Sequence, residues 1–409
     1  MRGRELVGQR SETVRRANLS AIARELHGRG ALSRSELVAR TGLTRSAIRG
    51  LISEFVAAGL VTEARSEPDG LPGRPSPLVR PRREAAVVLA LEIAVDSIAA
   101  ALVGLDGATI EQLRVDRARG HSSVEEVTRD LAELAGRLSR LARVRPALLR
   151  VGVAVVGIVG RDDGLVSTAP NLGWRDVPLG QRLAAALGLG VPISVANEAD
   201  LGALIELRRG AARGADDLLF IAGEVGVGGG IVVAGQPLTG VSGYAGEIGH
   251  LPVNPAGRPC RCGSTGCWET EIGEEALLRR AGRPADGGRQ AVDEVIAAAA
   301  AGEPAALTAV AEVGRWLGIG VAGLVNVLNP RVVVLGGLFS RLYPLLIERV
   351  EEQLDRFTLA APRANVRLAP AQLGIDAPLL GAAELAFEPF LADPAAWLGA
   401  RDAVPAATA

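Results

Sequence analysis

The chain of 409 residues contains no lysine and only three cysteines. So few cysteines exclude a disulfide framework. All basic residues are arginines, so any contact to phosphate has to come from guanidinium groups or from backbone and hydroxyl donors. Residues 1–16 lack the apolar core of a signal peptide, and the apolar stretches 87–105 and 151–160 are too short, or too interrupted by acids, to span a bilayer. We therefore expect a soluble, cytoplasmic protein with no membrane partner.

An excess of charge of either sign is also missing, since the formal net charge is −1. This balance hides an asymmetry. Residues 1–83 carry sixteen arginines and eight acids, a net charge of +8, whereas the remaining residues carry 29 arginines and 38 acids, a net charge of −9. A basic head on an acidic body suggests that the N-terminal part alone contacts nucleic acid.

The N-terminal part shows the pattern of a winged helix-turn-helix. Apolar residues recur at helical spacing over 12–28, and Ser33-Arg34-Ser35-Glu36 is a capping box that opens a second, short helix. Thr44 caps a third helix, and strands near 60–61 and 77–80 complete a hairpin. We expect a mainly α-helical DNA-binding domain over 1–66, followed by a proline-rich wing and linker over 67–83.

In such domains the third helix lies in the major groove with its N-terminal residues at the base edges, where Arg pairs with guanine. Arg74, in a Gly-Arg-Pro triplet of the wing, is a candidate for the minor groove. The candidate DNA contacts are Ser33, Arg34, Thr44, Arg45, Ser46, Arg49 and Arg74. The alternative interpretation is a helical module that docks onto another protein.

Beyond residue 83 the chain alternates strands and helices, which indicates α/β layers. The predicted strands are 86–93, 98–105, 110–115, 149–159, 192–196, 218–222, 231–234 and 331–335, and a helix is predicted over 124–143.

A metal site is predicted where all three cysteines and one histidine fall within eighteen residues, at His250, Cys260, Cys262 and Cys267. Three thiolates and one imidazole fill the tetrahedral shell of Zn²⁺ and leave no place for water, so this zinc would be structural rather than catalytic. The alternative is three unrelated buried thiols.

This loop, with the preceding Gly246-Glu247-Ile248-Gly249 and the following Glu269, resembles the ROK family of bacterial sugar kinases and sugar-responsive repressors. The resemblance implies an α/β actin-like (ribonuclease H-like) two-lobed ATPase fold after the winged helix. It implies a first lobe over 84–200, onto which a C-terminal helix at about 376–395 packs back. A second lobe over 201–375 would contain the zinc loop 250–267.

The resemblance also implies a small-molecule sugar or sugar phosphate bound between the lobes. The residues at the family's sugar-contacting positions are Asn171, Asn197, Glu198, Glu247, His250 and Glu269. We expect His250 to bind zinc through one ring nitrogen and a sugar hydroxyl through the other.

The sequence departs from the kinases of the family at the catalytic and phosphate-binding elements. The kinases place an Asp after the first Asn as general base, whereas this chain has Glu198, one methylene longer. Their first glycine-rich phosphate turn corresponds to 92–97 here, which contains no glycine. A vestigial second loop keeps Gly226, Gly228 and Gly229 but carries Glu224 and Val225, which favours a plain hairpin turn.

These observations predict a sugar-responsive transcriptional repressor of carbohydrate genes. It would bind operator DNA as a homodimer or homotetramer and would have lost kinase activity. The main alternative is a ROK-type sugar kinase that phosphorylates hexoses with ATP and has an N-terminal regulatory domain. A scaffold that binds neither DNA nor sugar is a second alternative.

Overall fold

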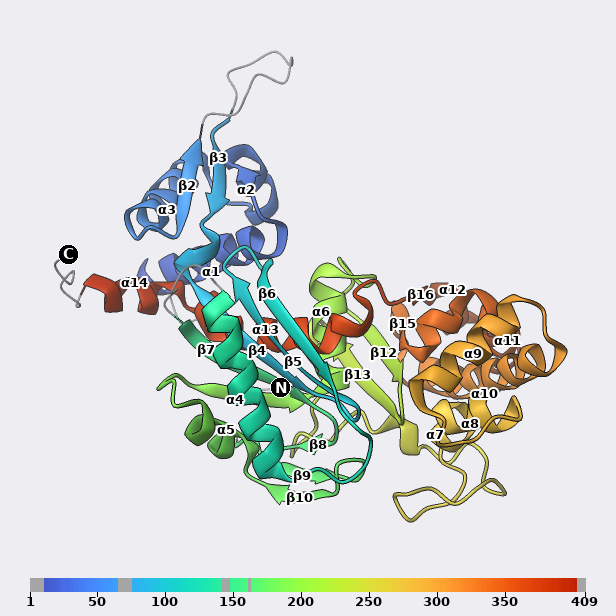
Figure 1. Cartoon of the computed structure of the whole chain (residues 1–409). Coiled ribbons are helices and arrows are strands. Elements are labelled where there is room, and N and C mark those ends of the chain that lie inside the picture. The colour runs from blue at the N-terminus through green and yellow to red at the C-terminus, as the bar shows by residue number, and fades with distance from the viewer. Residues whose placement is uncertain (1–10, 65–75, 142–147, 161–162, 403–409) are drawn as a thin grey trace.

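A computed structural model describes residues 11–64, 76–141, 148–160 and 163–402. It shows a small N-terminal domain above a body of two lobes (Figure 1). The predicted wing contact Arg74 lies outside the described residues.

The N-terminal domain is a winged helix-turn-helix. Its elements are α1 (Ser11–Arg29), β1 (Leu32–Ser33), α2 (Arg34–Thr41), α3 (Arg45–Ala57), β2 (Val61–Ala64) and β3 (Leu78–Pro81). The capping box is confirmed, because Ser33 accepts from the backbone N–H of Glu36 while the Glu36 carboxylate accepts from that of Ser33. Strand β1, which pairs with β3, has only two residues and was not predicted.

The first lobe is built on a five-stranded sheet of order β11-β7-β4-β5-β6. Its strands are β4 (Val87–Ile93), β5 (Ser97–Gly104), β6 (Thr109–Asp116), β7 (Leu148–Val155) and β11 (Ile193–Asn197). The predicted strand 149–159 is wrong in one respect: at Gly157 the backbone takes φ +114°, so the chain breaks into β7 and a short β8 (Ile158–Val159). Strand β8 joins β9 (Val166–Ala169) and β10 (Trp174–Val177) in a separate sheet.

The second lobe repeats this plan with the order β14-β13-β12-β15-β16. Its strands are β12 (Leu218–Gly223), β13 (Val227–Val233), β14 (Gln236–Pro237), β15 (Val332–Gly337) and β16 (Arg367–Pro370). In both sheets the first strand pairs antiparallel with the second and parallel with the fourth. The lobes are therefore two copies of one topology.

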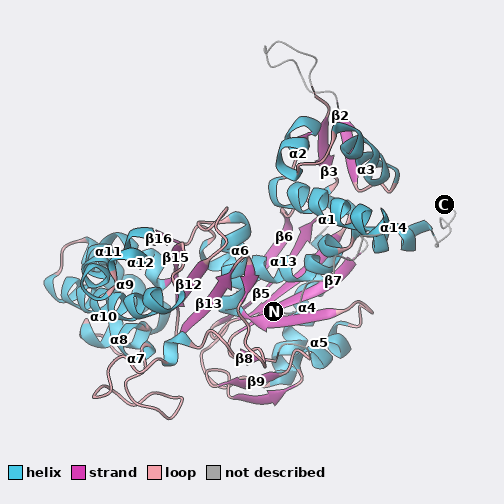
Figure 2. Cartoon of the chain, turned by 180° about the vertical axis from the view of Figure 1, so that it is seen from behind, coloured by secondary structure: helices cyan, strands magenta, loops and turns pink. Residues whose placement is uncertain are grey.

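Helices cover both faces of each sheet (Figure 2). In the first lobe α4 (Val124–Leu141) covers one face and α13 (Ala377–Ala392) the other, and alternate residues of β4 face each helix. In the second lobe α6 (Glu198–Arg209) covers one face. The lobe boundary predicted at 200/201 falls within α6. The remaining helices are α5 (Leu179–Leu187), α7 (Glu269–Ile272), α8 (Glu274–Arg280), α9 (Gly288–Ala300), α10 (Pro304–Leu328), α11 (Leu338–Phe357), α12 (Ala360–Asn365), α14 (Pro394–Asp402), and the 3₁₀ turns η1 (Arg83–Ala85), η2 (Ile248–His250) and η3 (Gly374–Asp376).

Helix α10 is long and apolar enough to cross a membrane by length and composition, a feature that the sequence analysis did not single out. Its buried side chains, among them Val313, Leu317 and Val321, belong to the core that covers the other face of the second sheet. This packing accounts for its apolar composition as that of a core helix.

The hydrophobic core of the winged-helix domain is continuous with that of the first lobe. Leu19, Ile22 and Leu26 of α1 belong to the same buried cluster as Phe387 and Phe390 of α13. The winged-helix domain is therefore packed onto the body and not only connected to it by chain.

Candidate functional site

A cavity of about 800 Å³ lies between the two lobes. Its wall includes the residues that directly follow β4, β11 and β12, namely Ala94, Glu198 and Glu224, and Gly337 at the end of β15. In open α/β sheets ligands bind at this carboxyl edge of the strands. All six predicted sugar contacts line the cavity, so the fold brings together residues that lie up to 98 positions apart.

Asn197 is held by backbone contacts. Its side-chain oxygen accepts from the N–H groups of Ala199 (2.7 Å) and Asp200 (3.3 Å), which caps α6, and its amide donates to Gly157 O at 2.8 Å. The cap fixes the start of α6, so that Glu198, the next residue, faces the cavity.

Asn171 of the first lobe contacts the loop 250–267 of the second lobe across the cavity. Arg261, between two of the cysteines, donates to the Asn171 oxygen at 2.9 Å and also pairs with Glu275. This contact joins the two lobes across the cavity. Arg261 could not be predicted from the sequence, because a single Arg in a loop gives no signal of a partner 90 residues away.

The part of the cavity between the β4–β5 turn and the β12–β13 turn is acidic. Desolvation, together with Glu224, Glu92 and Asp96, raises the pKa of Glu198 to about 8. Glu224 faces the cavity, and desolvation raises its pKa to about 7. Arg289 lowers this pKa, whereas Asp96 and Glu92 raise it further. At neutral pH Glu198 is therefore mostly protonated.

The turn between β4 and β5, which the resemblance predicts to correspond to the first phosphate turn of the family's kinases, is closed by ion pairs. Asp96 accepts from Arg289 of α9 at 2.8 Å and from Arg119 at 3.1 Å, and Arg119 also pairs with Glu274 of α8. These contacts join the lobes and occupy the cationic groups beside the turn.

The glycines of the second loop have a packing role. A Cβ on Gly228 would lie 2.9 Å from Ala199 Cβ, and one on Gly229 would lie 3.0 Å from Gly246 O and closer still to Ile248. Gly226 faces Glu269, where a Cβ would lie 3.1 Å from the carboxylate. The predicted hairpin is confirmed, because residues 223 and 227 pair across the turn between β12 and β13.

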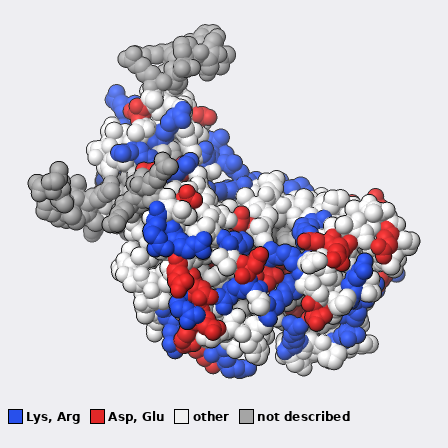
Figure 3. All heavy atoms as spheres, in the orientation of Figure 1, with Lys and Arg blue, Asp and Glu red and all other residues white. Residues whose placement is uncertain are grey.

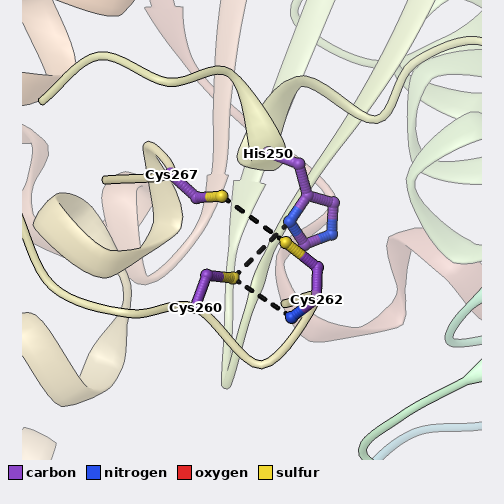
Figure 4. A group of neighbouring side chains, drawn as sticks. All are labelled: His250, Cys260, Cys262 and Cys267. Carbon is purple, nitrogen blue, oxygen red and sulfur yellow. Dashed lines mark hydrogen bonds between the residues drawn. The ribbon is translucent and has the colours of Figure 1, made fainter. Parts of the chain in front are cut away.

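His250, Cys260, Cys262 and Cys267 form a cluster that can hold a metal ion (Figure 4). Their ligand atoms all lie within 4.8 Å of one another. The Sγ atoms of Cys262 and Cys267 are 3.6 Å apart, and Cys260 Sγ is 3.8 Å from His250 Nδ1. Thiolates about 2.3 Å from a tetrahedral Zn²⁺ would be separated by roughly 3.8 Å, so the donor set and spacing fit that ion.

The imidazole of His250 faces in two directions. Its Nδ1 atom points at the cysteines, while Nε2 lies 3.9 Å from the Glu247 carboxylate on the cavity side. Glu269 is close to the cluster as well, with one oxygen 2.9 Å from Cys260 Sγ. The same loop therefore carries the metal cluster and lines the cavity.

The winged-helix domain presents its own candidate interface. Thr44 caps α3, and Arg45, Ser46 and Arg49 are exposed at the first turns of this helix. Among the described residues neither Arg45 nor Arg49 forms an ion pair. Arg34 differs, because it is bound to Glu63 of β2 within the domain.

A winged helix-turn-helix joined to a two-lobed actin-like body with a cavity between the lobes defines the class of this protein. The chain belongs to the ROK family, whose model matches residues 88–388. Residues 19–70 match the model of the MarR family, in agreement with the N-terminal helix-turn-helix.

The chain is similar to relatives of two kinds. It is 27% identical over 381 residues to the xylose repressor of Bacillus subtilis, covering 92% of this chain and 97% of the repressor. It is 35% identical over 270 residues to a glucokinase of Halalkalibacterium halodurans, covering 62% of this chain and 81% of the kinase. The crystal structure of a ROK family transcriptional regulator, a homolog of the E. coli MLC protein, superposes with a TM-score of 0.76 at 24% identity, covering 93% of this chain and 97% of that one, which shows the same fold.

Proposed function

We propose that this protein is a sugar-responsive transcriptional repressor whose kinase activity is lost. The observation that carries the proposal is that one chain combines a winged-helix domain packed onto the first lobe with a cavity between the lobes. This cavity contains all six predicted sugar contacts and an acidic part with Glu92, Asp96, Glu198 and Glu224. Similarity to the xylose repressor extends over both parts, whereas similarity to the glucokinase covers 62% of the chain.

The acidic side of the cavity argues against phosphoryl transfer. Glu224 adds negative charge there when it is ionised, and Arg289 and Arg119 already pair with Asp96 and are not free to bind a triphosphate. A general base has to be ionised, and with a pKa of about 8 Glu198 keeps its proton at neutral pH. Glu198 can instead donate a hydrogen bond to a sugar hydroxyl.

The remaining polar groups suit a sugar or a sugar phosphate. Asn171, Glu247, His250 and Glu269 offer donors and acceptors to neighbouring hydroxyls. A Zn²⁺ ion held by His250 and the three cysteines would be structural: it would fix the imidazole ring and the loop that carries Arg261. The protein would act in the cytoplasm as a dimer or tetramer whose winged helices bind two operator half-sites.

The test combines sugar binding, DNA binding and catalysis on the full chain. DNA fragments selected by the purified protein serve as operator. D-xylose, D-glucose, N-acetyl-D-glucosamine and the 6-phosphates of the latter two sugars serve as effectors. We expect one of these compounds to raise the melting temperature and to release the DNA, with no ATP turnover in a coupled assay. Turnover that Glu198→Gln abolishes would establish the kinase instead, and DNA binding that is absent or insensitive to salt would favour a scaffold.

A further inference from the structure

Two helices run from the cavity to the DNA-binding domain. Helix α6 begins at Glu198 in the cavity wall, and α13 begins with Ala377 and Pro378 in the same wall. They run in the same direction, because Leu201 lies against Gly381 near their starts while Arg208 pairs with Glu388 near their ends. A helix of twelve residues spans about 18 Å.

The backbones of α6 and α13 are in direct contact near the starts of both helices. A Cβ on Gly381 would lie 2.2 Å from the carbonyl oxygen of Leu201, so the two backbones touch at this point. Each helix also packs on the sheet of a different lobe. A change in the angle between the lobes therefore has to be accommodated at the ends of this helix pair.

Helix α1 of the winged-helix domain lies along the far end of α13 in the opposite direction (Figures 1 and 2). Ser20 donates to Leu391 O at 2.6 Å, and Arg24 pairs with Glu388. One turn further along α1, His27 faces Glu384. Residues 20, 24 and 27 thus follow one face of α1 over two turns in register with 391, 388 and 384.

The last of these contacts is a buried polar cluster, which we call the joint: His27, Arg208, Arg209 and Glu384. His27 and Glu384 are each 3% exposed. The His27 Nδ1 atom donates to Leu105 O at 2.7 Å, while Nε2 lies 2.7 Å from an Arg209 nitrogen and 3.2 Å from Glu384. Glu384 accepts from Arg208 at 2.8 Å.

Charge holds the joint together. Burial by itself would raise the pKa of Glu384, but His27, Arg209 and Arg208 lower it well below its usual range, so this carboxylate stays ionised. Arg209 also donates to Gly107 O of the first lobe at 2.5 Å. The joint therefore connects α1, α6, α13 and the first lobe at one point.

We infer that α6 and α13 transmit the state of the cavity to the winged-helix domain, and that the joint is where they set the orientation of α1. The inference rests on the proposed function. A ligand that changes the angle between the lobes shifts the C-terminal ends of α6 and α13, and the joint turns that shift into a rotation of α1 and of the DNA-reading helix α3. The physical basis is one packed chain of elements that both sites contact.

The test measures coupling and not only affinity. The sugar used is the one from the panel above that raises the melting temperature most. DNA affinity is determined with and without a saturating amount of this sugar. The proteins compared are the wild type, Glu384→Gln, Arg208→Lys and Asp393→Asn. Glu384→Gln neutralises the joint, and Arg208→Lys keeps the charge but loses the planar fork that reaches both Glu384 and Glu388. Asp393→Asn is the matched control, because Asp393 forms an exposed ion pair with Arg16 at the same interface.

We expect the sugar to weaken DNA binding by the wild type and by Asp393→Asn about tenfold or more, and by the two joint variants less than about threefold. Sugar affinity and sugar-free DNA affinity should each stay within about threefold of the wild type. If Glu384→Gln does not fold, Arg208→Lys decides.

Joint variants that release DNA like the wild type would overturn the inference and leave the proposed function standing. Loss of sugar binding in these variants would overturn it as well, since the joint would then only hold the fold. A wild type from which no sugar of the panel releases DNA would overturn both.

Discussion

At the scale of single residues, Glu198 shows how its surroundings change the chemistry of a carboxyl group. Its pKa of about 8 results from desolvation and from the acids Glu224, Glu92 and Asp96. The folded protein therefore keeps a proton on Glu198 that the unfolded chain releases above about pH 4.5. Stability contributed by this group is present below that pH and is lost as the pH rises toward 8.

This linkage predicts the effect of Glu198→Gln on stability. Glutamine has the shape of the protonated acid and no proton to lose, so the variant should match the wild type near pH 5 and exceed it in stability at pH 8. The slope for a single group is at most about 1.4 kcal/mol per pH unit. Urea denaturation at both pH values measures it, with Glu133→Gln on the exposed face of α4 as control. An equal difference at both pH values would contradict the raised pKa.

The metal cluster leads to a second prediction at this scale. Cys262→Ser replaces one thiolate by a weak ligand, so we expect purified protein to fall from about one equivalent of zinc to less than half. Thr265→Ala, an exposed change in the same loop, should keep its metal and its melting temperature. Elemental analysis measures the metal content. Freshly purified wild type with less than about half an equivalent would contradict the four-ligand zinc site.

At the scale of elements, the hairpin of β12 and β13 positions the loop that carries Glu247 and His250. A Cβ on Gly249 would lie 2.2 Å from the carbonyl oxygen of Val227 in β13. A Cβ on Gly229 would likewise meet Ile248 and Gly246, so packing accounts for glycine at both positions. Turn η2 can therefore hold His250 between the cavity and the cysteines only while the contact with β13 persists.

We accordingly expect Gly249→Ala to push η2 away from β13, with a loss of about 1–3 kcal/mol in stability and weaker binding of both metal and sugar. Gly323→Ala is the matched control, because nothing lies within 4 Å of its Cβ position and it sits in α10. That change should stabilise the protein by about 0.5–1 kcal/mol. Chemical denaturation and zinc content measure both variants. A Gly249→Ala protein with normal metal content would contradict the close contact as the support of the loop.

Local signals in the sequence predict some elements well and others not at all. The capping box at Ser33 and the cap at Thr44 define α2 and α3, because side chain and backbone bond within three residues. The break at Gly157 and the bond between Arg261 and Asn171 depend on neighbours that only the fold supplies. The pair of His27 and Glu384, 357 residues apart, leaves no periodic trace in either helix.

At the scale of the whole molecule, the N-terminal part and the two lobes carry net charges of opposite sign. The N-terminal 83 residues carry a net charge of +8 and the rest a net charge of −9. On the visible face of the lobes acids and arginines are intermixed (Figure 3). Many arginines of the body are paired, including Arg114 with Glu92 and Arg289 with Asp96. The body therefore has little free positive charge to offer to DNA, and contact should be confined to the head.

This distribution makes Arg45 and Arg49, both exposed at the start of α3, the test of DNA binding. Replacing either by Ala should weaken binding of the selected fragment by about 1–3 kcal/mol where the side chain reads a base. A side chain that contacts phosphate would instead reduce the dependence of log K on log salt by about 0.9. Arg129→Ala removes the same charge from an exposed position on α4 and should change neither quantity, since the body stays clear of the DNA. Fluorescence anisotropy at several salt concentrations separates these effects. A loss with Arg129→Ala equal to that with Arg45→Ala would mean that the acidic body also contacts DNA, against the division of charge between head and body.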